Sequence, residues 1–222
     1  MVIEALGDRG LILKFSDEIN QTAHLSVMKI DKFLLNFKIE GVIEWIPSYS
    51  SVTLIYNPEI IKYKCLLEKL EHFDESSVDF VVEGKTVEIP VLYGGKFGPD
   101  IEFVANANKI SVEDVIKIHS GANYEVWMIG FMPGFPYLYG LPSSINVPRL
   151  KSPRKFVPSG SVGIAGGQTG IYPIDSPGGW QIIGRTPLKI FDVKKDPPVL
   201  FDVGDRVKFI SIDEKGYEKL CR

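Results

Sequence analysis

Two short, mostly apolar segments, VIEAL and LILKF, open the chain and predict a β-hairpin over residues 2–6 and 11–15, because the segment GDRG between them is typical of a tight turn. Apolar residues then recur at helical spacing up to about Lys38. Ser16 or Asp17 is the expected N-cap of this helix. The pattern therefore predicts two strands followed by a long helix.

Gly41 is expected to end that helix, and two further strands are predicted at residues 42–46 and 51–56, around the turn PSYS. A second helix is predicted over residues 58–70, beginning at its proline, and a strand over residues 78–82. The order ββαββαβ predicts a small α+β domain of ferredoxin-like type, with helices on one face of a sheet.

The polar segment EGK marks the expected boundary between two domains, residues 1–83 and residues 84–222. In the second domain, a strand is predicted at residues 87–93 and a helix from Pro99 to about Asn108. A capping-box variant then precedes a short helix that ends near His119. From Tyr124 onward, short apolar segments alternate with turns, which is typical of a β-barrel or sandwich.

Composition narrows the class of protein. The chain has 222 residues, of which 45% are hydrophobic, so it can bury a sizeable core. A net charge of −3 without a long Lys/Arg run argues against nucleic-acid binding. No apolar stretch suits a membrane span, and the start lacks a secretory pattern. Cys65 and Cys221 favour reduced thiols, with a disulfide as the alternative, so we expect a soluble cytoplasmic protein.

The residues between 130 and 190 differ from the rest of the chain. This window holds 11 of the 21 glycines and 9 of the 15 prolines, together with many aromatic residues. It has six basic residues and one acid, Asp175, so its charge is +5 in a chain of net charge −3. A basic, aromatic and glycine-rich surface predicts a site for a small anionic or polar ligand.

Arg149, Arg154 and Arg185 are the candidate substrate-binding charges, because a planar guanidinium can bind a carboxylate or phosphate through two hydrogen bonds. The alternative for each is an exposed, solubilising arginine. Further candidates lie on one glycine turn, where backbone N–H groups would face a ligand oxygen and side chains would add donors: Gly166, Gly167, Gln168 and Thr169. These glycines could also shape barrel corners, and both roles can hold together.

Six residues beside proline–glycine turns are candidates for a pocket wall or a partner interface: Phe131, Pro133, Phe135, Tyr137, Tyr172 and Trp180. Aromatic residues of β proteins more often form core, which is the alternative here. His119 is a weak candidate for a general base; satisfying carbonyls at a helix end is its alternative role. We find no metal-ligand spacing, P-loop or GxSxG motif. A site rich in binding groups and poor in chemical ones suits a protein that completes its active centre with a partner.

Three blocks of this window carry a family resemblance: GFMPGFPYL, PRLKSPRKFVPSGSVGIAGGQTGIYP and PGGWQIIGRTP. They resemble the signature of the family of 5-oxoprolinase B subunits, also known as the allophanate hydrolase subunit 1 family, which includes the sporulation-kinase inhibitor of Bacillus. The resemblance extends more weakly over essentially the whole chain. It implies a cyclophilin-like β-barrel in the second domain.

The resemblance also implies a function. It indicates the B subunit of an ATP-dependent 5-oxoprolinase, which opens the lactam of pyroglutamate to glutamate together with the C and A subunits. ATP, with Mg²⁺ at the nucleotide, would serve the complex, and the isolated chain is expected to be inactive. A complex with the C subunit is expected to use Phe131, Phe135 and Trp180 as apolar anchors. The alternatives are another small amide substrate, such as allophanate, and an inhibitor that binds the helical domain of a sensor histidine kinase.

Overall fold

The computed structural model describes residues 1–78 and 84–221, and the chain divides into two compact units, Met1–Val82 and Glu83–Arg222. The domain boundary expected between residues 83 and 84 falls beside the segment that is not described. Independent folding of residues 1–83 and 84–222 therefore stays a prediction.

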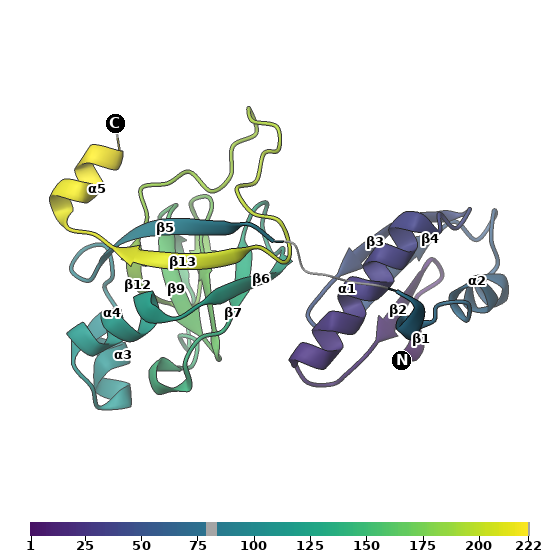
Figure 1. The fold of residues 1–222 in the computed structure, drawn as a ribbon, viewed down its shortest axis with the longest axis horizontal. Helices are drawn as coiled ribbons and strands as arrows, with labels where there is room; N and C mark the ends of the chain where they lie inside the picture. Colours follow the sequence, from purple (N-terminus) through teal and green to yellow (C-terminus); the bar gives the residue numbers. More distant parts are fainter. Residues whose placement is uncertain (79–83, 222) are drawn as a thin grey trace. The chain divides into compact units, whose positions relative to one another are not determined.

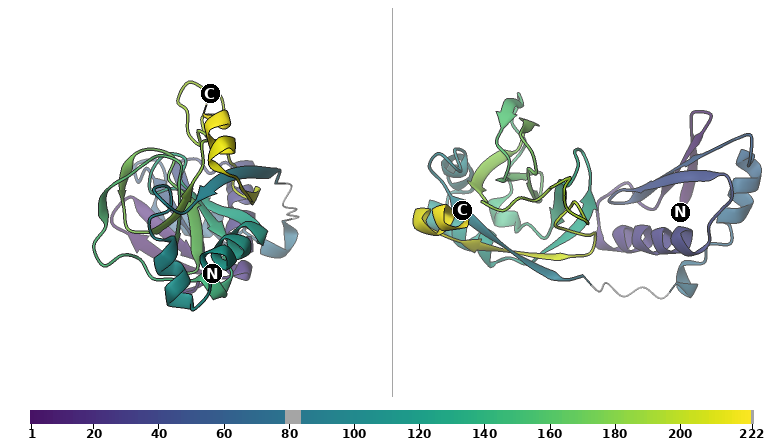
Figure 2. Two further views of the ribbon diagram at one scale, coloured as in Figure 1. Left: turned by 90° about the vertical axis from the view of Figure 1, so that its left-hand side faces the viewer. Right: turned by 90° about the horizontal axis from the view of Figure 1, so that it is seen from above.

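Within residues 1–78, four antiparallel strands form a sheet of order β1-β2-β4-β3. Their bounds are β1 Val2–Leu6, β2 Gly10–Lys14, β3 Val42–Pro47 and β4 Ser51–Tyr56. Helix α1, Gln21–Asn36, runs along one face of the sheet (Figures 1 and 2). The predicted hairpin and the two strands after the helix are confirmed.

Both helices of this unit begin later than expected. Asn20 is the N-cap of α1, since its side-chain oxygen accepts a hydrogen bond from the Ala23 N–H at 2.9 Å, whereas Ser16 accepts from Glu18. Helix α2 spans Tyr63–Leu70, because the turn that precedes it is held by the carbonyl and side chain of Asn57. A local polar turn thus replaces the first predicted helical turn in each case.

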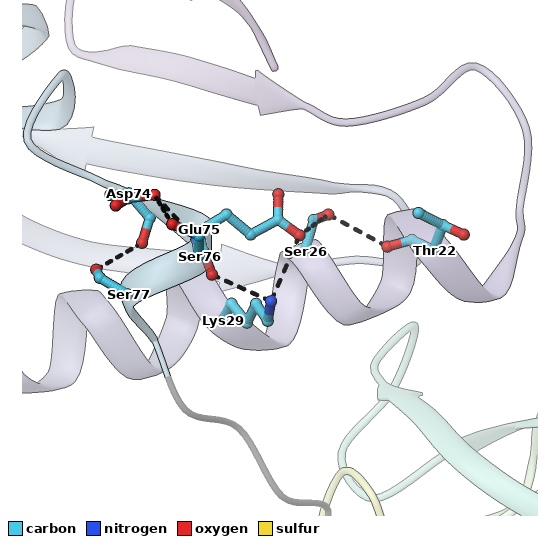
Figure 3. A network of polar contacts seen from close by, with 7 residues as sticks. All are labelled: Thr22, Ser26, Lys29, Asp74, Glu75, Ser76 and Ser77. Carbon is cyan, nitrogen blue, oxygen red and sulfur yellow. Dashed lines mark hydrogen bonds and ion pairs between the residues drawn. The ribbon is translucent and has the colours of Figure 1, made fainter.

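A polar network attaches the end of this unit to α1 (Figure 3). The short 3₁₀ helix η1, Glu75–Ser77, begins at Asp74, whose side chain accepts from the Ser76 N–H. The Ser26 hydroxyl donates to the Glu75 carboxylate at 2.8 Å, and Lys29 donates to the Glu75 carbonyl at 3.1 Å. These contacts hold η1 against α1.

The ferredoxin-like arrangement is not confirmed. Helix α1 follows a hairpin instead of a single strand, and β1 occupies one edge of the sheet. The strand predicted over residues 78–82 lies almost wholly outside the described residues. The coarser expectation of an α+β unit with a small sheet does hold for residues 1–78.

Within residues 84–221, seven strands close into a barrel of order β10-β7-β6-β13-β5-β12-β9, which confirms the predicted barrel. Only the β13–β5 pair among these described strands is parallel. The bounds are β5 Thr86–Tyr93, β6 Tyr124–Ile129, β7 Pro136–Tyr139, β9 Ser161–Ala165, β10 Gln168–Ile171, β12 Gln181–Arg185 and β13 Arg206–Ser211.

Helices and a β-ribbon complete the barrel unit. Helices α3, Ile101–Asn108, and α4, Val112–Gly121, pack apolar faces against the barrel core (Figure 1). The capping box predicted at the start of α4 is present. Outside the barrel, β8, Arg154–Val157, pairs with β11, Ser176–Gly178. Helix α5, Glu214–Leu220, follows β13.

Candidate functional site

A cavity of about 320 Å³ lies between the barrel and the β8–β11 ribbon. All of its lining residues come from the window of unusual composition between residues 130 and 190. The lining residues are Phe131, Phe135, Tyr137, Arg149, Leu150, Pro153, Tyr172, Pro177, Gly178, Gly179 and Trp180. Five of the six residues predicted to form a pocket or interface therefore line this one space. We call it the aromatic cavity. Pro133 is exposed in the adjacent turn and does not line it.

Perpendicular ring contacts hold the wall of the aromatic cavity. The Phe135 ring packs edge-on against Tyr172, with centroids 5.2 Å apart, and against Trp180 at 5.4 Å. A Cβ at Gly170 would lie 2.9 Å from the Phe135 ring, and one at Gly178 would overlap the Tyr172 hydroxyl. Glycine at these two positions therefore lets the rings approach the strands closely. The three rings are buried, so they form both core and cavity wall.

Phe131 is the exposed member of the aromatic wall. Its side chain is 66% exposed, and its φ of +69° is in the left-handed region, which a bulky residue rarely adopts. The ring contacts Phe135 edge-on, with centroids 5.9 Å apart. Of the three expected interface anchors, Phe135 and Trp180 are buried, so only Phe131 presents a large apolar surface to a partner.

Arg149 supplies the positive charge of the aromatic cavity. Its guanidinium lies over the Trp180 ring, 5.8 Å from the centroid, which favours a cation–π contact. Within the described residues it has no carboxylate at ion-pair distance. Burial raises the pKa of Tyr137 and of Tyr172, and the charge of Arg149 partly offsets both shifts. Arg149 is therefore placed to bind an anion at the mouth of the cavity.

Arg154 makes contacts that the sequence did not predict. Its guanidinium forms an ion pair with the Asp100 carboxylate and donates to the Trp180 carbonyl at 3.3 Å. The second carboxylate oxygen of Asp100 accepts from the Ile182 N–H at 2.6 Å. Arg154 therefore joins β8 to the barrel and lies outside the aromatic cavity. Sequence reasoning missed Asp100, because an aspartate after a proline at a helix start is typical of a cap.

Arg185 also lies outside the aromatic cavity. Its Nε donates to the Ser159 carbonyl at 2.7 Å, and its side chain lines a separate concavity of about 170 Å³. The structure thus divides the three candidate arginines among the aromatic cavity, a structural ion pair and a second concavity.

The glycine turn is a structural corner. Gly166 and Gly167 both have positive φ values, +57° and +80°, and join β9 to β10. Their N–H groups donate to the Val147 carbonyl at 2.9 Å and to the Asn146 side chain at 2.7 Å. The donors expected to face a ligand oxygen are therefore already paired within the chain, and Gln168 follows them at the start of β10.

His119 and Thr169 lie in the barrel core and not at a surface site. The Thr169 hydroxyl donates to the Gly163 carbonyl at 2.9 Å, so it accepts from His119 Nε2 at 3.0 Å. His119 Nδ1 then accepts from the Tyr93 hydroxyl at 2.8 Å. Burial lowers the pKa of His119 to about 3 and raises that of Tyr93. A neutral, fully buried histidine is not accessible as a general base, and capping the helix end is not its role either.

Comparison with known proteins identifies the family. The family model described as "Carboxyltransferase domain, subdomain C and D" matches residues 1–201. The 5-oxoprolinase B subunit of Bacillus subtilis (strain 168) is 44% identical over 227 aligned positions, which cover 97% of this chain and 94% of that protein. This chain belongs to the family of 5-oxoprolinase B subunits. The expected family resemblance is thus confirmed, and the name favours an enzyme subunit over a kinase inhibitor.

Solved structures extend the comparison. A conserved uncharacterized protein from Pyrococcus horikoshii is 47% identical to this family member, with a TM-score of 0.59 and coverage of 97% of this chain and 100% of the other. The crystal structure of TTHA0988 is 33% identical, with a TM-score of 0.81, over 92% of this chain but only 40% of that longer chain. The fold therefore also occurs inside a longer polypeptide.

For a member of the 5-oxoprolinase B-subunit family, the described site has recognition groups without a catalytic set. No group of three or more His, Cys, Asp or Glu residues that could hold a metal ion occurs in the described residues. No described helix is long and apolar enough to cross a membrane. The described cavity lining instead offers aromatic rings and one arginine, groups that suit a flat, anionic molecule.

Proposed function

We propose that this chain is the B subunit of an ATP-dependent 5-oxoprolinase, which converts 5-oxo-L-proline, ATP and water to L-glutamate, ADP and phosphate in a complex with the C and A subunits. A cytoplasmic location is part of the proposal. The aromatic cavity is the observation that supports substrate binding by this chain. Its walls are buried aromatic rings, and the arginine at its mouth forms no ion pair with a described carboxylate. The enzyme side rests on the names of its relatives.

The chemistry of 5-oxoproline fits the aromatic cavity. The substrate has a small, nearly flat lactam ring and one carboxylate. A volume of about 320 Å³ is at the low end of ligand pockets and suits a small ring. Arg149 would bind the carboxylate through two hydrogen bonds. Tyrosine hydroxyls are protonated at neutral pH, and burial raises the pKa of Tyr137 and Tyr172 further, so both can donate to a lactam carbonyl.

The partner subunits would supply the reaction. Opening an unstrained lactam requires activation, and ATP can provide it by phosphorylating the amide oxygen. The described cavity lining contains arginine and tyrosine but no carboxylate, cysteine or histidine. In this proposal, ATP and its Mg²⁺ act in the complex, and this chain holds the substrate while positive charge stabilises the developing anion.

The C subunit would cover the mouth of the aromatic cavity. Phe131 is exposed beside that mouth, and an exposed aromatic side chain is a strong interface anchor. The longer solved relative, TTHA0988, supports a partner module, because its matching region occupies only 40% of its chain. Enclosure by a partner would also exclude water from the activated intermediate.

Co-expression with homologues of the C and A subunits tests the proposal. We expect one complex with the C subunit in size-exclusion chromatography, and glutamate release from 5-oxoproline that requires ATP and all three subunits. Two separately eluting proteins would contradict the interface. Equal activity without this chain would contradict the function, and activity only with allophanate would reassign the substrate.

A further inference from the structure

A second concavity of about 170 Å³ adjoins the aromatic cavity, and we call it the basic groove. Its wall includes Lys96, Phe97, Arg154, Phe156, Ser161 and Arg185. Arg154 connects the linings of the two spaces, because it lines the basic groove while its guanidinium donates to the carbonyl of Trp180, a residue of the aromatic cavity.

The basic groove has two positive charges that no described carboxylate neutralises. Asp100 is already paired with Arg154 and bonded to a backbone N–H. Among the described residues, neither Lys96 nor Arg185 has a carboxylate at ion-pair distance. Two such cations share one concavity although the chain has a net charge of −3. They favour a dianion over a monoanion such as a carboxylate.

Arg185 is held in place by a hydrogen bond, and Lys96 contacts an aromatic ring. Arg185 is fixed through Nε, which donates to the Ser159 carbonyl, so its two terminal nitrogens remain to bind a ligand. Lys96 Nζ lies over the Phe97 ring, 5.1 Å from its centroid. Phe97 in turn packs against Tyr217, with centroids 4.8 Å apart. A site with preset cations loses little side-chain entropy on binding.

We propose that the basic groove binds a phosphoryl group, which receives two hydrogen bonds from Arg185 and one from Lys96. A phosphate monoester carries close to two negative charges at neutral pH and has three acceptor oxygens, which matches two cations and a fork of donors. The group belongs either to a nucleotide or to free phosphate. The proposal does not depend on the activity of the enzyme complex, since it concerns binding by this chain alone.

Titration calorimetry on the purified full chain tests the groove with pyrophosphate, ATP, inorganic phosphate and acetate. We expect saturable pyrophosphate binding that weakens as salt rises. Arg185→Gln and Lys96→Gln should each weaken it about tenfold, because each removes one charge-assisted contact. Lys155→Gln is the matched control. It also removes one positive charge, but from a residue of β8 next to Arg154 that does not line the groove.

The outcomes separate the possibilities. Binding of ATP but not of inorganic phosphate assigns the group to a nucleotide, and the reverse assigns it to free phosphate. No saturable binding at millimolar pyrophosphate, equal binding of acetate, or an equal loss in Lys155→Gln would overturn the proposal. Circular dichroism checks the fold of each variant. If Arg185→Gln unfolds, Lys96→Gln still decides, because its side chain is exposed and makes no hydrogen bond in the described residues.

Discussion

Arg149 and Arg154 lie close together in the chain, but their guanidinium groups have different partners. Arg149 stacks over Trp180 without a described carboxylate, and Arg154 is paired with Asp100. The exposed fraction of the Asp100 side chain is only 12%, so this carboxylate depends on its partner more than a surface acid would. The two arginines therefore give opposite predictions.

At Arg149, we expect a loss of activity without a loss of stability. Arg149→Lys keeps the charge but not the planar fork, so kcat/KM of the reconstituted complex for 5-oxoproline should fall about ten- to a hundred-fold. The Tm should stay unchanged, because the side chain is exposed. Lys151→Ala, an exposed neighbour outside the aromatic cavity, is the control. Unchanged kcat/KM in Arg149→Lys and Arg149→Ala would remove Arg149 from the site.

At Arg154, we expect a substitution to lower the stability of the fold. Arg154→Ala leaves the Asp100 carboxylate without its cation and should cost about 1–3 kcal/mol of the free energy of unfolding. Arg154→Lys should recover part of that loss, since an ammonium can still approach the carboxylate. Urea unfolding of the purified chain measures both. If the variants lose activity but keep the free energy of unfolding of the natural chain, Arg154 belongs to the substrate site instead.

At the scale of elements, one series of hydrogen bonds inside the barrel joins β5, α4, β9 and β10. Hydrogen bonds run from Tyr93 through His119 and Thr169 to the Gly163 carbonyl. Every donor in this series of hydrogen bonds has an acceptor, which is the condition for burying such groups at low cost. The network therefore fixes how α4 sits against the barrel wall.

This network predicts a pH-dependent stability. His119 has a folded-state pKa of about 3, whereas an unfolded histidine has a pKa of about 6.5, so the unfolded chain binds the proton between these values. Stability from this residue is thus complete above about pH 6.5 and is lost as the pH falls toward 3. From pH 7 to pH 5, His119 alone should lower the free energy of unfolding by about 2 kcal/mol.

The matched variant is His119→Gln, which keeps a polar side chain but does not titrate. Denaturant unfolding at pH 7 and pH 5 should show a smaller drop for the variant than for the natural chain. Identical drops would mean that His119 can be protonated in the folded protein. The carboxylates titrate in both proteins, so the difference between the two isolates the histidine.

For the whole molecule, each unit has a core of its own. One core surrounds Leu11, Leu54 and Leu66, and the other surrounds Val126, Ile164 and Phe209. The network between α1 and η1 lies wholly within the first unit, so it does not require the barrel to form.

Separate expression of residues 1–83 and 84–222 should therefore give two folded fragments. Each should unfold in one cooperative transition, and the two transitions should match those of the intact chain. Calorimetry or circular dichroism measures this. If neither fragment folds, the units depend on each other and the boundary is wrong.

Signals that act within a few residues were readable from the sequence. The GDRG turn determined the hairpin, and the Ser111–Asp114 capping box determined the start of α4. Family membership was also readable, because three blocks of residues keep their order and spacing. The aromatic residues and glycines of the window lie together along one cavity wall, since a ring beside a strand needs a neighbour without a side chain.

Tertiary structure alone decided what each polar group does. Arg154 meets Asp100, His119 meets Tyr93 and Thr169, and Gly167 meets Asn146, all across long separations in the chain. Residue type sets what a side chain can bind, but closure of the barrel sets which partner is within 3 Å and whether water is excluded. The sequence therefore determined the local elements and the family, whereas the fold decided that Arg149, alone of the three candidate arginines, lines the aromatic cavity.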